Sequence, residues 1–129
     1  MEFRENRAIY LQIMDYVSEQ ILLDRWKAGD KIVSVRELAA QLEVNPNTVA
    51  RSYELLQNQQ MIVNKRGIGF FVADDALKKI KKWRKDEFLK QELPLIFKTM
   101  YLLDLDISCL QEEYHKFIKE IDQLNHENK

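Results

Sequence analysis

The chain has 129 residues and a formal net charge of -1, the size of one domain or of one small domain with an appendage. Hydrophobic residues make up 46% of it, and only 3 Gly and 2 Pro are present. This composition argues against a disordered chain and against an all-β protein, which needs many turns, and it favours long helices. The near-zero charge argues against a uniformly basic nucleic-acid-binding protein, so a DNA-binding surface must be a patch formed by folding.

Three features bear on the compartment in which the protein works. The longest apolar runs are a few residues, far below the ~18 needed to span a bilayer, which excludes an integral membrane protein. The first ten residues lack the basic and then apolar layout of a signal peptide. The single Cys109 cannot form an internal disulfide and suits a reducing environment. We therefore expect a cytoplasmic protein without membrane contact, with Cys109 as a small buried residue.

The first predicted element is a helix over residues 8–26. One of its faces is apolar at every fourth position, through Ile9, Ile13, Val17 and Ile21. Gly29-Asp30 predicts a turn after this helix. Residues 31–33 are β-prone but too few to predict more than a minor strand.

Two further helices follow, joined by a tight turn. Ser34 and Glu37 have the spacing of a capping box, which begins a helix that ends near Glu43. Asn45 is a good N-cap and Pro46 suits the first helical position, so the next helix begins there and runs to about residue 59. The predicted inward positions of the two helices are Val35, Leu38, Ala39, Leu42, Val49, Tyr53 and Leu56. Two helices joined in this way form a helix-turn-helix.

A β-hairpin is predicted after the helix-turn-helix. Residues 61–63 and 69–72 are apolar and β-prone, and a basic, glycine-containing segment separates them. A hairpin appended to a helix-turn-helix is a wing. We therefore expect a winged helix-turn-helix domain over residues 1–73.

Residues 74–129 predict a helical tail. A helix begins after Asp74-Asp75 and ends, kinks or restarts at Pro94, and Asp106 or Ser108 caps a last helix. The tail repeats apolar positions with no second core domain to cover them, which predicts pairing with a second copy of the chain. The positions expected at that dimer interface are Leu77, Ile80, Trp83, Phe88, Leu95, Ile96, Met100, Leu110, Tyr114, Phe117 and Ile121.

The stretch from Ile9 to Val72 resembles the winged helix-turn-helix domain of GntR-family bacterial transcription regulators. The residues that carry the resemblance are Gly29-Asp30, Ser34-x-Arg36-x-Leu38-Ala39-x-x-Leu42-x-Val44-x-x-x-Thr48-Val49, Tyr53-x-x-Leu56, Ile62 and Gly67-x-Gly69-x-Phe71-Val72. The turn from Val44 to Arg51 and the short tail are similar to the YtrA subfamily, in which the tail serves dimerisation. The family's usual proline before Ser34 is absent, and Pro46 stands where many members have arginine.

The start of the second helix and the tip of the wing are the expected DNA surface. Asn pairs bidentately with adenine in the major groove, and recognition helices read bases with their N-terminal residues. Basic side chains at the wing tip can reach phosphates or a flanking minor groove, and a glycine there lets the backbone approach. Arg36 resembles the family arginine that contacts DNA. The expected DNA-contacting residues are Arg36, Asn45, Asn47, Thr48, Arg51, Lys65, Arg66 and Gly67, with Asn45 also serving as the helix cap.

Catalytic and metal-binding motifs are weak in this sequence. Gly67-Ile68-Gly69 lacks the continuation of a phosphate-binding loop and falls in the predicted hairpin. Glu112-x-x-His115 has the outline of a di-metal motif, but that site needs two such motifs and two more carboxylates, so we expect exposed side chains there. We predict no enzyme activity and no cofactor.

Together these features predict a mainly α protein with a small β-hairpin wing, in which residues 1–73 bind DNA and residues 74–129 form a helical dimerisation tail. The predicted function is sequence-specific binding of double-stranded DNA by a homodimer at a palindromic operator, with repression implied by the resemblance. A small-molecule effector is either absent or bound at the dimer interface, because the tail is too small for an enclosed pocket. The alternative is a winged-helix module that binds protein without specific DNA binding, which the neutral charge of residues 1–73 permits.

Overall fold

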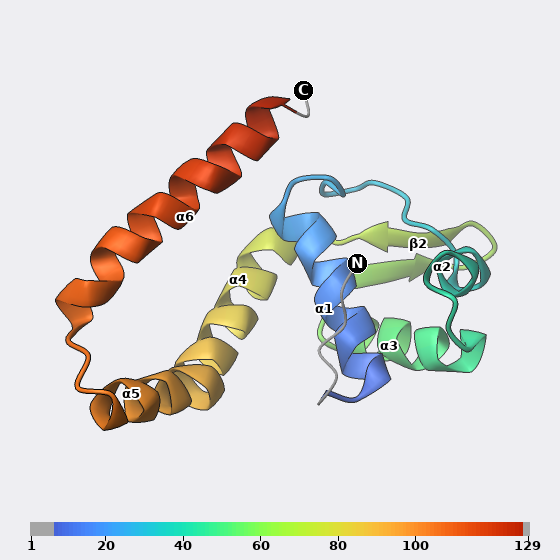
Figure 1. Cartoon of the computed structure of the whole chain (residues 1–129). Helices are drawn as coiled ribbons and strands as arrows, with labels where there is room; N and C mark the ends of the chain where they lie inside the picture. The colour runs from blue at the N-terminus through green and yellow to red at the C-terminus, as the bar shows by residue number, and fades with distance from the viewer. Residues whose placement is uncertain (1–6, 128–129) are drawn as a thin grey trace. The chain divides into compact units, whose positions relative to one another are not determined.

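The computed structural model of the chain describes residues 7–127 (Figure 1). Residues 1–6, on which part of the expectation about a signal peptide rests, lie outside this range. The elements are α1 (Ile9–Leu22), α2 (Val35–Leu42), α3 (Pro46–Asn58), β1 (Ile62–Lys65), β2 (Gly69–Val72), α4 (Ala76–Glu87), the π-helix η1 (Phe88–Glu92), α5 (Leu93–Leu102) and α6 (Ile107–Glu127). The expected fold class, mainly α with a small hairpin wing, is confirmed. None of the described helices combines the length and apolarity needed to cross a bilayer.

The described chain forms two compact units that divide after Lys85. We call them the first unit and the second unit. The core of the first unit is built by α1, α2, α3, the hairpin and α4, and its fully buried side chains include Ile13, Val17, Leu38, Val49, Tyr53, Leu56 and Ile80. Helix α1 ends at Leu22, earlier than predicted, and the chain then turns so that the Trp26 and Tyr16 rings pack at right angles at a centroid distance of 6.3 Å.

The helix-turn-helix forms as its capping residues predict. The Ser34 hydroxyl accepts the Glu37 N–H at 3.1 Å and donates to the Glu37 carboxylate at 3.1 Å, so Glu37 binds the hydroxyl rather than the backbone of Ser34. Helix α2 ends at Leu42, and the capping residue Glu43 that follows adopts a left-handed conformation with φ 56°. Asn45 then caps α3 by accepting the Asn47 N–H on Oδ1 at 2.8 Å, and Pro46 is the first helical residue.

The wing is a two-stranded antiparallel hairpin in which Ile62 pairs with Val72 and Lys65 with Gly69. The predicted minor strand at residues 31–33 is a single bridge between Lys31 and Phe71, which attaches the segment before α2 to the edge of the hairpin. Within the first unit, α2, the start of α3 and the turn between β1 and β2 lie toward the same end (Figure 1).

Helix α4 packs as part of the first unit. Ala76 and Ile80 are fully buried in its core, and the Arg84 guanidinium donates to the buried Ser18 hydroxyl of α1 at 2.8 Å. The division into compact units therefore falls after Lys85, whereas the sequence placed the boundary after Ala73. This packing buries Ala76 and Ile80, whereas Leu77 of the same helix remains exposed.

The second unit consists of η1, α5 and α6. In η1 the Leu93 N–H bonds to the carbonyl of Phe88, five residues back, and α5 begins immediately before Pro94. Pro94 has no N–H and crowds the carbonyl four residues earlier, so a wider π-turn lets the chain remain helical through the proline and into α5. Asp106 caps α6 by accepting the Ile107 N–H at 2.9 Å, and Ser108 donates to its carboxylate at 2.9 Å.

Every side chain of α6 from residue 107 to residue 126 is exposed. The prediction that Cys109 is buried is therefore wrong. Small apolar residues are buried only where another element covers them, and α6 carries its apolar face uncovered in the single chain.

Candidate nucleic-acid interface

Helix α3 has two sharply different faces. Val49, Ser52, Tyr53 and Leu56 are buried, while Asn47 and Arg51 are exposed and Thr48 is half-buried at the edge between the two faces. The polar side of the N-terminal half of α3 is thus presented to solvent, with the apolar side fixed in the core. A helix with these two faces can place its polar side chains in the major groove while its apolar side chains stay packed in the core.

Three contacts hold α3 in place. The Ser52 hydroxyl lies 2.8 Å from the Tyr10 carbonyl of α1 and 3.1 Å from the Thr48 carbonyl of its own helix, and its single proton is shared between them. The Tyr53 hydroxyl donates to the Val33 carbonyl at 2.8 Å, just before α2. The Tyr53 ring also meets the Phe70 ring of the wing edge-on, at a centroid distance of 5.0 Å.

Burial of Tyr53 raises the pKa of its phenol well above the ordinary value, and electrostatic interactions with the Tyr16 phenol and the Glu37 carboxylate add to this effect. The hydroxyl therefore remains protonated and continues to donate to Val33 throughout the physiological range. Helix α3 is consequently a rigid support for the side chains on its exposed face.

The side-chain amides of Asn45 and Asn47 differ in which of their atoms are available to bind a ligand. Asn45 uses its Oδ1 atom to cap α3. The side-chain amide of Asn47 is exposed and makes no hydrogen bond within the described residues. Bidentate pairing with adenine needs both the oxygen and the nitrogen of the amide, so Asn47 is the better placed of the two.

Arg51 has a partner that the sequence did not predict. Its guanidinium carbon lies 3.9 Å above the centroid of the Tyr10 ring in the first turn of α1. Tyr10 was not among the predicted site residues, and nothing in the local pattern of α1 distinguishes it. Only the packing of α1 against α3 brings the two side chains together.

The wing tip presents two basic side chains that differ in their surroundings. The Lys65 ammonium lies 4.3 Å from the centroid of the Phe71 ring on the partner strand, and Arg66 is exposed in the turn. Gly67 follows with φ 79°, in the left-handed region that glycine adopts without strain. Arg36, the second residue of α2, is exposed.

The predicted pairing residues fall into two groups. Ile80 is fully buried in the first unit, Met100 is 6% exposed and Trp83 packs partly buried against the core of the first unit. Their surface is therefore largely covered within one chain. The remaining predicted positions are all exposed: Leu77, Phe88, Leu95, Ile96, Leu110, Tyr114, Phe117 and Ile121.

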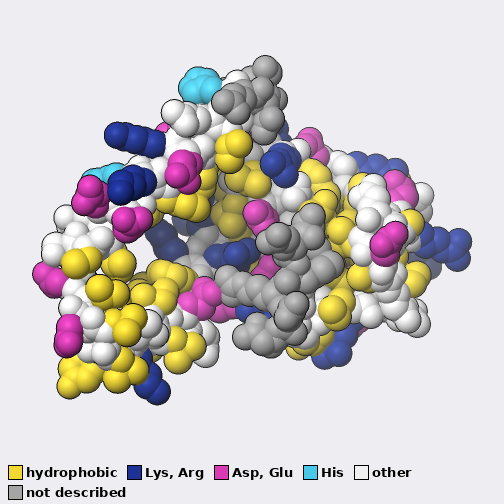
Figure 2. Space-filling model, viewed as in Figure 1, with side chains coloured by type: hydrophobic (Ala, Val, Ile, Leu, Met, Phe, Trp, Pro, Cys, Tyr) yellow, Lys and Arg dark blue, Asp and Glu magenta, His cyan; other side chains and the backbone are white. Residues whose placement is uncertain are grey.

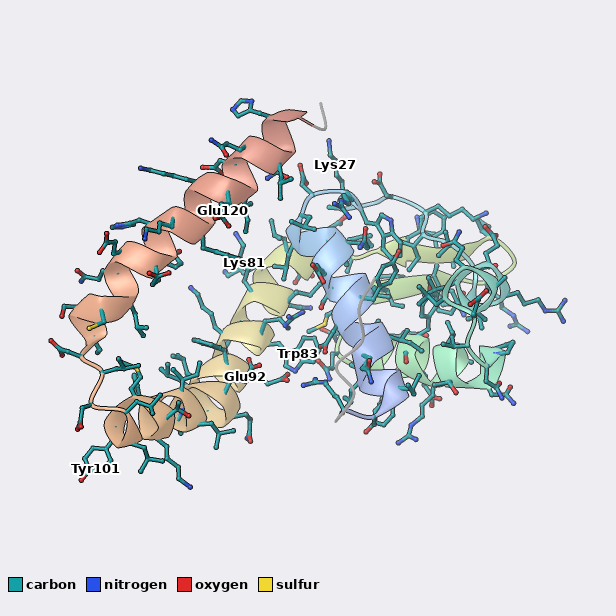
Figure 3. The ribbon with its side chains drawn as sticks, in the orientation of Figure 1. Lys27, Lys81, Trp83, Glu92, Tyr101 and Glu120 are labelled. Carbon is teal, nitrogen blue, oxygen red and sulfur yellow. The ribbon has the colours of Figure 1, made fainter. Side chains whose placement is uncertain are left out.

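Hydrophobic side chains gather visibly over α5 (Figure 2). Tyr101, at the end of that helix, projects outward and is 83% exposed (Figure 3). The second unit thus carries extensive apolar surface on both of its α-helices. Exposed apolar surface of this kind marks interaction sites in folded proteins.

Comparison with known proteins gives three consistent matches. The family model for bacterial regulatory proteins of the gntR family matches residues 9–72. The chain is 36% identical over 104 residues to the uncharacterized HTH-type transcriptional regulator YhcF of Bacillus subtilis (strain 168), covering 81% of this chain and 84% of YhcF. It is 32% identical over 118 residues to the HTH-type transcriptional repressor YtrA of the same organism, covering 92% of this chain and 87% of YtrA.

Among solved structures, a GntR family transcriptional regulator from Listeria monocytogenes superposes with a TM-score of 0.68. It is 33% identical in sequence, and the match covers 92% of this chain and 98% of that one. The similarity therefore extends beyond the winged helix into the helical tail.

Proposed function

Because the chain belongs to the GntR family of bacterial transcription regulators, we propose that it is a repressor that binds a palindromic operator as a homodimer in the cytoplasm. Membership of this family makes it a transcription regulator with a helix-turn-helix DNA-binding fold, and not an enzyme. The observation that carries the proposal is the division of α3 into a buried apolar face and an exposed polar face.

The proposed base-reading residues are those on the exposed side of the first turns of α3. Asn47 offers an unengaged amide, Arg51 offers a guanidinium, and Thr48 and Asn45 flank them. The proposed backbone contacts come from Arg36 on α2 and from the wing tip, where positive charge meets phosphate and the bare Gly67 backbone allows close approach. These residues carry positive or neutral polar groups, which favours DNA over the alternative of a protein partner.

The proposed dimer interface centres on α6. Its apolar residues alternate at spacings of three and four: Ile107, Leu110, Tyr114, Phe117, Ile121 and Leu124. This is the spacing of a coiled-coil seam, and each of these side chains is at least 37% exposed in the single chain. A helix with such a stripe is stabilised by burying it against a partner, and a second copy of the chain provides an identical stripe.

A two-fold symmetric dimer would bind a DNA site that has the same two-fold symmetry. Two copies of α3 would read the same bases on opposite strands, with half-sites about 34 Å or a multiple apart. Repression is proposed from the similarity to YtrA, whose name describes a repressor. An effector, if the protein uses one, would bind at the dimer interface.

The test is selection of the purified protein against random DNA duplexes. Enrichment of an inverted repeat with evenly spaced half-sites is the expected result. Enrichment of a single, non-repeated site would overturn the dimeric mode of binding. Failure to enrich any sequence would overturn specific DNA binding and favour the protein-binding alternative.

The wing is expected to contribute affinity without sequence preference. Replacing Lys65 and Arg66 by Ala should weaken binding to all duplexes alike and reduce the slope of log K against log salt by about 1 for each phosphate that the variant no longer touches. The measurement is a titration of the selected duplex and of a scrambled duplex at several salt concentrations. Lys119→Ala, which removes an exposed lysine from α6, is the control and should leave the slope unchanged.

An effect of the wing variant confined to one base position would mean that the wing reads bases directly. An unchanged salt slope would mean that the wing does not contact DNA.

A further inference from the structure

The contact between Tyr10 and Arg51 joins two elements that are distant in the sequence. The Arg51 guanidinium carbon lies 3.9 Å above the Tyr10 ring centroid, well inside the roughly 6 Å range of a cation–π contact. Arg51 is on α3, one helical turn beyond Asn47, and Tyr10 is in the first turn of α1. The ring therefore lies directly beside the helix that carries the proposed base-reading residues.

The Tyr10 ring is itself held in place. Its backbone carbonyl lies 2.8 Å from the Ser52 hydroxyl, and Ser52 is buried and adjacent to Arg51. The Tyr10 side chain is partly buried and packs against the core of the first unit. The Ser52 contact fixes the Tyr10 backbone beside α3, and the packing against the core restrains the ring, which therefore offers a stable platform for the arginine.

Stacking on an aromatic ring uses the face of the guanidinium and leaves its edges free. All five N–H donors of arginine lie in the plane of the group and point outward from it. No ion pair engages Arg51 within the described residues, and its side chain as a whole is exposed. Arg51 is thus restrained in orientation while its donors are available to a base or a phosphate.

We propose that Tyr10 is a positioning residue for DNA recognition, which holds the Arg51 guanidinium in the orientation in which it meets the operator. The inference rests on the proposed function, because it requires Arg51 to contact DNA. The physical benefit is preorganisation. An unrestrained arginine loses side-chain freedom when it binds, whereas one that is already stacked on a ring has lost part of that freedom before DNA arrives.

A purely structural role for the same contact makes different predictions. If the stacked pair only ties α1 to α3, its removal lowers the stability of the first unit and leaves the preference for particular bases intact. If Tyr10 positions Arg51, its removal changes base preference at the positions that depend on Arg51. The two roles are separated by measuring stability and base preference on the same variants.

The experiment uses the full chain with Tyr10→Leu, Tyr10→Phe, Arg51→Ala and the double variant Tyr10→Leu/Arg51→Ala. Each is titrated with the duplex selected by the parent protein and with every single-base variant of one half-site, and its thermal unfolding is recorded. Tyr16→Leu is the matched control, because it removes a tyrosine ring from α1 that contacts Trp26 instead of Arg51.

Tyr10→Leu is expected to weaken binding to the selected duplex about three- to tenfold, because the stacking and the restraint on Arg51 are both removed. It should also relax the preference at the same base pairs as Arg51→Ala. Tyr10→Phe keeps the ring and should restore affinity to near that of the parent. The double variant should bind no more weakly than Arg51→Ala, because Tyr10 acts only through Arg51.

Several outcomes would overturn the inference. Additive losses in the double variant would mean that Tyr10 acts independently of Arg51, and equal losses for Tyr10→Phe and Tyr10→Leu would assign the effect to the hydroxyl. A reduced melting temperature with unchanged base preference would assign Tyr10 a structural role. If the parent protein enriches no sequence in the selection, it is the proposed function that fails. If the parent enriches a sequence and Tyr10→Leu binds it like the parent, only the positioning role fails.

Discussion

Phe117→Asp on α6 is expected to turn the protein into a monomer and to weaken operator binding by about 10²–10⁴-fold, because two linked contacts with DNA become one. Phe117 lies in the middle of the apolar stripe of α6 and is 56% exposed in the single chain. Its replacement therefore removes little packing from the protomer. In a dimer the introduced carboxylate would lie at the centre of the apolar interface between the two α6 helices, where it would lose its hydration.

Sedimentation of both proteins and titration of the selected duplex measure this effect. Gln123→Asp is the matched control, because it introduces the same side chain and the same change of charge on α6 outside the apolar stripe. A parent protein that sediments as a monomer at tens of micromolar would contradict the dimer, and with it the inverted repeat.

Truncation of the chain after Lys85 is expected to give a monomeric protein by a second means, removal of the whole proposed interface on α6. Ala76 and Ile80 complete the core of the first unit, and Arg84 binds Ser18, so the cut must follow these residues of α4 rather than precede them. The shortened protein is expected to fold and to bind single half-sites weakly. Failure of this protein to fold, with Phe117→Asp still folded and monomeric, would show that the second unit also stabilises the first.

The second large effect is expected from Asn47→Ala, which should weaken the selected site by ~1–3 kcal/mol and relax the preference at a few base pairs. The Asn47 side chain is exposed and makes no hydrogen bond within the described part of the chain, so the free energy of unfolding should change little. Titration with single-base variants of the operator, alongside thermal unfolding, measures both quantities.

Asn45→Ala is the informative comparison, because Asn45 caps α3 through its Oδ1 atom, which lies 2.8 Å from the Asn47 backbone nitrogen. Removal of such a cap costs ~1 kcal/mol of stability. Asn45→Ala should therefore lower the melting temperature, whereas Asn47→Ala should not. Parent-like affinity and base preference for Asn47→Ala would mean that the start of α3 is not the reading surface.

The elements of the first unit could be predicted from the sequence because their signals are local. Ser34, Asn45 and Pro46 set the starts of two helices through contacts with residues two or three positions away, and Gly67 allows the turn of the wing. The inward positions of α3 follow from helical periodicity alone, and Val49, Tyr53 and Leu56 are fully buried as predicted. Local signals of this kind also carried the resemblance to the GntR family.

The contacts between secondary-structure elements could be established only from the tertiary structure. Periodicity gives α4 an apolar face, but only packing shows that this face covers the core of the first unit, so that Ile80 is buried there. The same holds for Cys109, which is predicted to be buried and which is exposed on α6, where none of the described elements covers it. A repeating pattern states that a face is apolar and does not state what covers it.

The pairing of Tyr10 with Arg51, and of Lys65 with Phe71, likewise depends on which elements meet. Sequence by itself determined which side chains α3 and the wing tip present, because helix and strand periods fix the direction of each residue. It did not determine the orientation in which those side chains are held. That orientation depends on rings contributed by α1 and by the opposite strand, and contacts between distant segments are set by the packing of the whole core.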